Sequence, residues 1–92
     1  MITIEIPEEV VQKVQKADIE QAARKEIIAH ILEKGLDVSP ERFNAYQAEY
    51  DAKFFAFEQA KQDIEKNFVR VTVKNPKNWT LDYNTRILSI EE

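Results

Sequence analysis

The chain of 92 residues contains no cysteine, a single glycine and only three prolines. Without cysteine there is no disulfide framework, no thiolate metal site and no cysteine nucleophile. The low proline and glycine content excludes a collagen-like or low-complexity chain, and one glycine cannot build a glycine-rich phosphate loop. No apolar run approaches the roughly 20 residues that span a bilayer. The first residues lack the basic start and apolar run of a secretion signal, so we expect a cytoplasmic protein without membrane contact.

The composition is that of an ordinary acidic domain. Hydrophobic residues make up 43% of the chain, and the formal net charge is −4. This length supports one hydrophobic core better than two, so we treat residues 1–92 as a single domain. An acidic protein lacks the cluster of cations that a nonspecific grip on nucleic acid requires, and nucleic acid is therefore not the expected partner. Composition alone does not specify an activity.

The N-terminal third is predicted to hold a strand and two helices. Apolar and polar residues alternate over 2–6, the period of a half-buried strand. Two apolar helical stripes follow, and they are out of phase with each other on either side of Asp18, a residue type that caps helices well. We therefore expect helices over about 8–16 and 19–34, with one kinked helix as the alternative.

A stop and a strong start separate these helices from the next. Gly35 is expected to end the preceding helix, with Leu36 supplying the apolar contact that often accompanies such a stop. Ser39 followed by Pro40 is typical of a helix start. Apolar side chains, most of them aromatic, then recur every three, four or seven residues, which predicts one long helix over 40–67. They are Phe43, Tyr46, Tyr50, Phe54, Phe57, Ile64 and Phe68.

The C-terminal third is predicted to form strands. Alternation of apolar and polar residues indicates strands over about 69–73, 79–83 and 86–90, with a two-residue turn or a longer loop at Asn84–Thr85. A two-residue turn places apolar residues opposite one another on a shared face of the last two strands. The expected cross-strand pairs are Tyr83–Arg86, Leu81–Leu88 and Trp79–Ile90.

Together these elements predict an α+β fold, with an elongated helical hairpin or bundle and a small antiparallel sheet from the N-terminal and C-terminal strands. A helix over 40–67 is about 42 Å long, whereas a compact domain of this size is roughly 30 Å across. The helix must therefore run along an antiparallel neighbour in its own chain or be covered by a second chain.

The side of the long helix opposite the aromatic stripe suggests a protein contact. Small residues there allow close approach of another backbone, and an aromatic ring lies beside them. Alanine is also simply the best helix former, and single exposed aromatic residues are common. The contact hypothesis makes these residues a surface for self-association or for a partner protein. They are Ala45, Ala48, Ala52 and Phe55.

A second expected contact lies in the C-terminal strands. Residues 69–92 carry a slight positive excess, and Trp79 and Tyr83 lie among these cations. An aromatic patch with a polar rim is typical of protein interfaces. The alternative is that Trp79 packs against the helices of its own chain.

Catalytic and metal-binding patterns are absent from the sequence. His30 is the only histidine, and with no cysteine there is no ligand set for zinc. Asp82 is expected on the solvent side of a strand, and the adjacent acid pairs have no pocket signature. We therefore expect neither an enzyme nor a cofactor or metal site. Only a pocket that gathers Asp82, Tyr83 and His30 would reverse this expectation.

The first third of the chain resembles the ribbon-helix-helix family of dimeric DNA-binding proteins. The segment Ile2-Thr3-Ile4-Glu5-Ile6-Pro7-Glu8-Glu9-Val10-Val11 is similar to that family's strand and proline-led first helix. Arg24-Lys25-Glu26-Ile27-Ile28 is similar to a run in its second helix. The resemblance implies that the strand pairs with a second chain and that Thr3 and Glu5 contact bases in the major groove.

The sequence therefore favours a non-enzymatic interaction or assembly protein that works as a homo-oligomer or as a subunit of a larger complex. Its expected partners are a second copy of the chain or another protein. The alternative, which follows from the resemblance, is a dimeric DNA-binding regulator such as a transcriptional repressor or an antitoxin.

Overall fold

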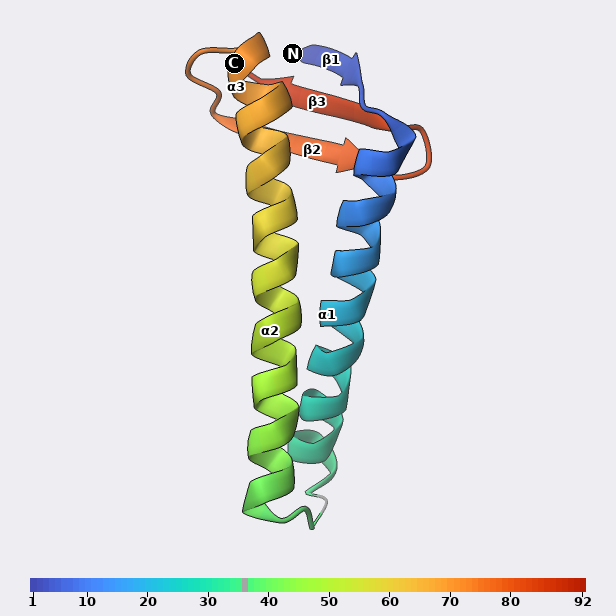
Figure 1. Ribbon diagram of the computed structural model, residues 1–92, viewed down its shortest axis with the longest axis vertical. Coiled ribbons are helices and arrows are strands. Elements are labelled where there is room, and N and C mark those ends of the chain that lie inside the picture. The colour runs from blue at the N-terminus through green and yellow to red at the C-terminus, as the bar shows by residue number, and fades with distance from the viewer. Residues whose placement is uncertain (36) are drawn as a thin grey trace.

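A computed structural model describes residues 1–35 and 37–92 of the chain. Two long antiparallel helices form a hairpin, and a three-stranded antiparallel sheet lies across one end of it (Figure 1). The expected α+β fold with a helical hairpin and a small sheet is confirmed. In chain order the elements are β1 (Ile2–Glu5), α1 (Glu8–Lys34), α2 (Pro40–Ile64), the π-helical turn η1 (Glu65–Val69), α3 (Arg70–Thr72), β2 (Asn78–Asp82) and β3 (Ile87–Glu91).

The ends of the long helices follow the expected local chemistry. Gly35 has a φ of 61°, and its N–H donates to the carbonyl of Ile31 at the end of α1. This left-handed conformation is the one that glycine adopts without a steric penalty. At the start of α2 the hydroxyl of Ser39 accepts a hydrogen bond from the N–H of Arg42, and Pro40 occupies the first turn. The expected contact of Leu36 lies outside the described residues.

Of the two alternatives for residues 8–34, the single helix is the one observed: α1 runs from Glu8 to Lys34, and the separate helices expected on either side of Asp18 are wrong. The amide of Gln21 donates to the carboxylate of Asp18 at 3.0 Å, but inside a continuous helix rather than at a new N-terminus. Residues facing α2 recur alternately at intervals of three and four, as in antiparallel coiled coils. Keeping this repeat continuous places two polar side chains, Gln21 and Arg24, at half-buried positions.

The predicted strand over 69–73 is also wrong. The chain stays helical through η1 and α3 to Thr72, whose hydroxyl donates to the carbonyl of Phe68 at 2.7 Å. The π-helical turn adds one residue to the repeat, so Val69 rather than Phe68 follows Ile64 into the core. The alternating valines do not require a strand here. Val69 is fully buried, Val71 is 73% exposed, and Val73 follows the end of α3 in an extended conformation.

The sheet has the order β1–β3–β2, so β3 is its central strand. The predicted pairs Trp79–Ile90 and Leu81–Leu88 are confirmed. On the other edge Ile2 pairs with Ile90 and Ile4 with Leu88. Across the three strands, Ile2, Ile90 and Trp79 are aligned, and so are Ile4, Leu88 and Leu81. Both sets lie on the face of the sheet that packs on the helices. The opposite face is lined mainly by polar residues such as Thr3, Ser89 and Thr80.

A four-residue loop from Tyr83 to Arg86 joins β2 to β3, instead of the two-residue turn at Asn84–Thr85. The carboxylate of Asp82 accepts from the backbone N–H groups of Asn84 and Thr85, at 2.9 and 3.2 Å. Arg86 takes a positive φ of 62° and donates its N–H to the carbonyl of Asp82. Asparagine followed by threonine lacks the glycine that tight two-residue turns favour, and the longer loop avoids that requirement.

The hydrophobic core lies at the sheet end of the hairpin, where β3 meets both helices. Its most deeply buried members are fully or almost fully removed from solvent, and Trp79, Leu81 and Phe57 pack around them. The core residues are Ile6, Val11, Val14, Ala60, Ile64, Val69, Leu88 and Ile90. Within the described part of the chain, no helix combines the length and apolar composition needed to cross a membrane.

Truncation of the central strand tests this location of the core. Leu88 is fully buried, so Leu88→Ala is expected to lower the free energy of unfolding by about 2–5 kcal/mol. Val71→Ala removes an exposed side chain and should change it by less than about 0.5 kcal/mol. Urea unfolding followed by circular dichroism measures both variants. Equal effects for the two variants contradict the assignment.

Candidate interaction surface

The half of the hairpin that extends beyond the sheet buries few of its large apolar side chains. We call this half the distal hairpin, formed by residues 19–34 of α1 and 40–56 of α2. Among these residues only Ile31 is buried, with 9% of its surface exposed. Five large apolar residues in the distal hairpin are exposed. Exposed apolar surface of this kind is typical of an interaction site. The five residues are Ile19 at 61%, Ile27 at 45%, Leu32 at 67%, Phe54 at 40% and Phe55 at 64%.

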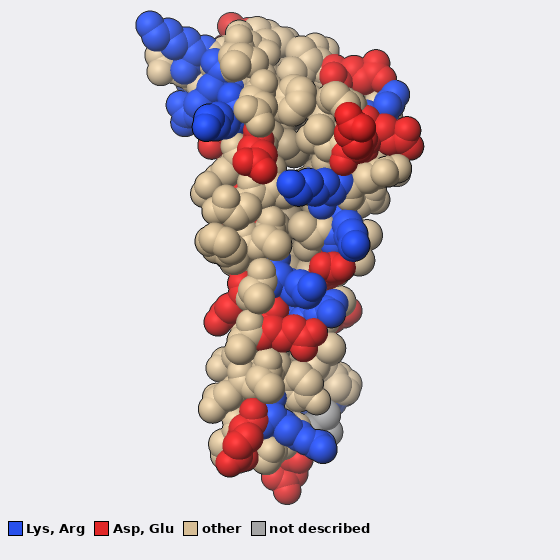
Figure 2. All heavy atoms as spheres, in the orientation of Figure 1, with Lys and Arg blue, Asp and Glu red and all other residues tan. Residues whose placement is uncertain are grey.

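Polar contacts replace apolar ones between the helices where the distal hairpin begins. Arg24 pairs with Glu49 at 2.9 Å, and Lys53 pairs with Glu20 at 3.3 Å. All four side chains are partly exposed, so each pair adds little to stability. Figure 2 shows positive and negative groups interleaved along the middle of the hairpin on the side away from the sheet. These pairs fix how the helices align more than they hold them together.

The side of the distal hairpin that faces the same way as the sheet is apolar. Residues seven apart lie on the same side of a helix. Gln47 and Phe54 are therefore on the same side of α2 as Lys61, which lines a groove together with residues of β2. A hollow of about 440 Å³ lies here, with only Lys25 and Asp51 as charged members. We call this surface the sheet-side face. It comprises the residues that line the hollow, Lys25, Ile28, Ala29, Leu32, Gln47, Tyr50 and Asp51, together with Phe54, whose ring centre lies 5.8 Å from that of Tyr50.

The opposite side of the distal hairpin has a hollow of its own. Its volume is about 640 Å³, and it lies between Ile27 and Ile31 of α1 and Tyr46 of α2. His30 and Glu26 also line it. Glu20 lies seven residues before Ile27, and Lys53 lies seven residues after Tyr46, so the ion pairs Lys53–Glu20 and Arg24–Glu49 follow on this side toward the sheet. Both sides of the distal hairpin thus carry apolar surface, but only this one leads into paired charges.

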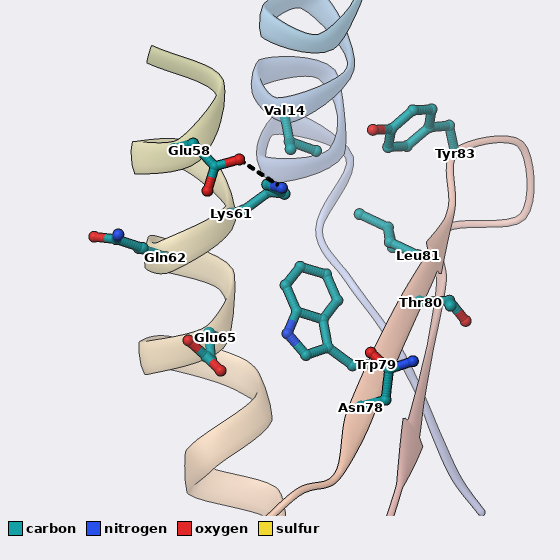
Figure 3. A pocket seen from close by; sticks show the side chains of 10 residues that line it. All are labelled: Val14, Glu58, Lys61, Gln62, Glu65, Asn78, Trp79, Thr80, Leu81 and Tyr83. Atoms are coloured by element: carbon teal, nitrogen blue, oxygen red, sulfur yellow. Dashed lines mark ion pairs between the residues drawn. The ribbon is translucent and has the colours of Figure 1, made fainter. Parts of the chain in front are cut away.

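A groove of about 590 Å³ lies on the sheet-side face, between β2 at the edge of the sheet and α2. We call this edge of the sheet the step. Side chains from β2 form one wall, and α2 forms the other, with Val14 of α1 behind them (Figure 3). Trp79 points from β2 toward α2 across the groove. The lining residues are Val14, Glu58, Lys61, Gln62, Glu65, Asn78, Trp79, Thr80, Leu81 and Tyr83.

The charged groups in this groove are already paired with neighbours. Lys61 contacts Glu58 at 2.7 Å and lies 4.6 Å from the ring centre of Phe57, while Glu65 contacts Arg70 at 3.6 Å. Across the described residues, no buried side-chain nitrogen or oxygen lacks a hydrogen-bond partner. The groove therefore presents an apolar floor and neutralised walls. This arrangement suits side chains of another protein better than a small charged ligand.

Tyr83 ties the groove to α1. Its hydroxyl donates to the carboxylate of Asp18 at 2.9 Å, a contact between residues 65 positions apart. Burial, followed by the hydrogen bond to Asp18 and by that residue's negative charge, raises the pKa of Tyr83 to about 12. The phenol is thus held neutral and works as a fixed donor that sets the position of the β2–β3 loop.

The structure places the predicted contact residues in two separate regions. Ala45, Ala48, Ala52 and Phe55 are all exposed, on the side of α2 that points away from α1. Trp79 and Tyr83 come together in the groove, where both are half-buried and Trp79 packs against the core. The two groups do not form one continuous patch. Their role as contact surfaces stays a prediction.

The residues of the alternative functions are also dispersed. Thr3 and Glu5 are exposed on β1, and Glu5 is paired with Arg86 at 2.6 Å. His30 lines the distal hollow, while Asp82 caps the β2–β3 loop, so these two do not meet Tyr83 in one pocket. Among residues 1–35 and 37–92, no group of three or more metal-ligating side chains gathers.

The contact residues expected from the sequence do not include Phe54 and Leu32, two residues of the sheet-side face. For Phe54 the sequence does carry a signal, the alternating three-four repeat of residues that face α1: Phe43, Tyr46, Tyr50, Lys53, Phe57, Ala60 and Ile64. This repeat directs Lys53 rather than Phe54 toward α1, which leaves Phe54 40% exposed beside Tyr50.

The contact between Tyr83 and Asp18 makes stability depend on pH. Because the pKa of about 12 in the folded chain exceeds the ordinary tyrosine pKa of 10.0, the stabilisation is complete below pH 10 and is lost as the pH rises toward 12. Absorbance at 295 nm should show one late-titrating phenol, and Tyr83→Phe should remove it. Asp18→Asn should let Tyr83 ionise at lower pH. An unchanged titration in either variant contradicts the assignment.

The surfaces of this chain thus consist of an apolar distal hairpin and a groove with paired charges at the edge of the sheet. Among known proteins, the chain matches no family model, no curated protein and no solved structure. Its function is therefore inferred from these surfaces alone.

Proposed function

We propose that this chain is a non-enzymatic assembly protein that associates with copies of itself through its distal hairpin. The observation that carries the proposal is the set of five large apolar side chains exposed there. Two helices alone cannot bury apolar residues on every side, and a further layer of helices supplies the missing cover. Binding of a different protein on the same surface is the other form of this proposal.

The shape of the molecule supports the same conclusion. Its principal extents are 49 × 24 × 21 Å, and its radius of gyration is 16.5 Å. A compact domain of this length has a radius of gyration of about 12 Å. A helical hairpin that projects so far from the core at its sheet end gains most from association with another helical surface.

Absolute mass in solution tests self-association directly. Light scattering on a sizing column, at loading concentrations between about 1 and 100 μM, is expected to show a species of at least twice the chain mass. The mass should fall on dilution if exchange is fast. A constant mass of 10.8 kDa over the whole range contradicts the proposal.

The second candidate is the dimeric DNA-binding regulator. One observation favours it: β1 is an edge strand of the sheet, and it exposes Thr3 and Glu5. This candidate predicts that duplex DNA binds and that affinity falls steeply between about 50 and 200 mM salt. Fluorescence anisotropy of labelled duplexes measures the effect. Absence of binding at the lower salt concentration refutes this candidate and leaves the assembly proposal intact.

A further inference from the structure

We infer that a second copy of the chain binds the sheet-side face in an antiparallel orientation. The tip of each hairpin, which is the end where α1 and α2 are joined, then lies against the groove beside the other copy's β2. This inference rests on the proposed self-association. It adds which face is buried, how the two copies are oriented and which residues carry the contact. The result is a bundle of four helices with one sheet at each end.

The surplus surface of the chain matches what such a dimer needs. The accessible surface is 6622 Å², whereas a compact monomer of 10.8 kDa has about 5,500 Å². The difference, about 1,100 Å², exceeds the roughly 800 Å² that each partner loses in an interface of standard size. One interface of standard size therefore removes most of this surplus from solvent.

Charge selects the sheet-side face over the opposite side. The sheet-side hollow contains one cation and one anion, Lys25 on α1 and Asp51 on α2, so two such faces do not repel each other. On the opposite side the pairs Arg24–Glu49 and Lys53–Glu20 occupy the middle of the hairpin. Covering that side would remove four charges from water, and this desolvation cost opposes association.

The sheet selects the antiparallel orientation. It lies on one side of the helices and at one end only, and it ends in the step occupied by the groove (Figures 1 and 3). Two sheet-side faces with their sheets at the same end would bring the sheets into collision. With the sheets at opposite ends, the bare helices overlap, and the groove of about 590 Å³ accepts side chains near the other copy's tip, such as Leu32.

The outward stripe of α2 is a weaker surface for the same partner. Ala45, Ala48, Ala52 and Phe55 come from one helix and include a single large side chain. The sheet-side face draws on both helices and includes Ile28, Leu32 and Tyr50, with Phe54 beside Tyr50. More apolar area is removed from water there, and the association is correspondingly stronger.

Two adjacent phenylalanines provide a matched test. Phe54 and Phe55 are neighbours in α2, and both are partly exposed, but only Phe54 lies on the sheet-side face. Phe54→Glu is expected to raise the dimer dissociation constant at least about 100-fold, because each dimer buries two of these charges. Phe55→Glu should change it less than about threefold. Light scattering over a dilution series measures both, and circular dichroism checks that each variant is folded.

Leu32→Glu and Ile27→Glu form a second pair, since both side chains are exposed on α1 but lie on opposite sides of the hairpin. Leu32→Glu should dissociate the dimer and Ile27→Glu should not. This pair decides the matter if Phe54→Glu fails to fold. Dissociation by Phe55→Glu or Ile27→Glu alone would overturn the choice of face, while the mass of the unmodified chain still supports self-association. A monomeric unmodified chain would overturn both.

The orientation has a readout of its own because Trp79 is the only tryptophan and lies in the groove. Antiparallel association covers Trp79 with the other copy's tip. Quenching of its fluorescence by acrylamide should therefore fall as the dimer forms, and Phe54→Glu should restore it. A dimer whose Trp79 stays as accessible as in the monomer refutes the antiparallel arrangement.

Discussion

The packing of β3 against the converging ends of the two helices is the interaction on which the rest of the structure depends. Leu88 and Ile90 are fully buried there, and Ile64, Val14 and Val69 close over them. β3 is also the central strand of the sheet, with β1 on one side and β2 on the other. Because β1 precedes α1 and β3 ends the chain, this one contact brings together the two ends of the sequence and fixes both helices at their bases.

The distal hairpin has no comparable centre. Where a continuous apolar seam would hold the helices together, the repeat instead places Gln21 and Arg24 on α1 and Lys53 on α2. Partly exposed ion pairs contribute little energy, but they disfavour other alignments of the two helices. The chain thus combines a strongly stabilised base with an extension whose geometry is set and whose apolar surface is left uncovered. That division of roles is what the assembly proposal explains.

Much of the architecture follows from the sequence because local and long-range signals agree. The cap at Ser39, the stop at Gly35 and the pairing of Leu81 with Leu88 are each specified by a few neighbouring residues. Errors arose where local pattern and tertiary context disagree. Valines at 69 and 71 prefer strands, but burial of Val69 behind Ile64 keeps the chain helical. Asp18 is a good cap, but the continuous repeat overrides it.

The sequence specifies the candidate site less completely than the fold, for a physical reason. A stripe of apolar residues on a helix shows that one side is buried, but it does not show by what. The aromatic stripe of α2 spans more of the helix circumference than one neighbouring helix covers, so assigning all of it to the core misplaces Phe54. Counting the repeat residue by residue separates the seam that contacts α1 from the surface that does not.

The two out-of-phase stripes of α1 have the same meaning. A single straight helix cannot bury both against one partner helix, so a chain that keeps α1 unbroken must leave one stripe to be covered otherwise. The break expected at Asp18 would have let each stripe face the same neighbour. Because the break is absent, one of the two stripes has no partner helix within the chain. The exposure of Ile19 and Ile27 is therefore a direct consequence of α1 remaining one helix from Glu8 to Lys34.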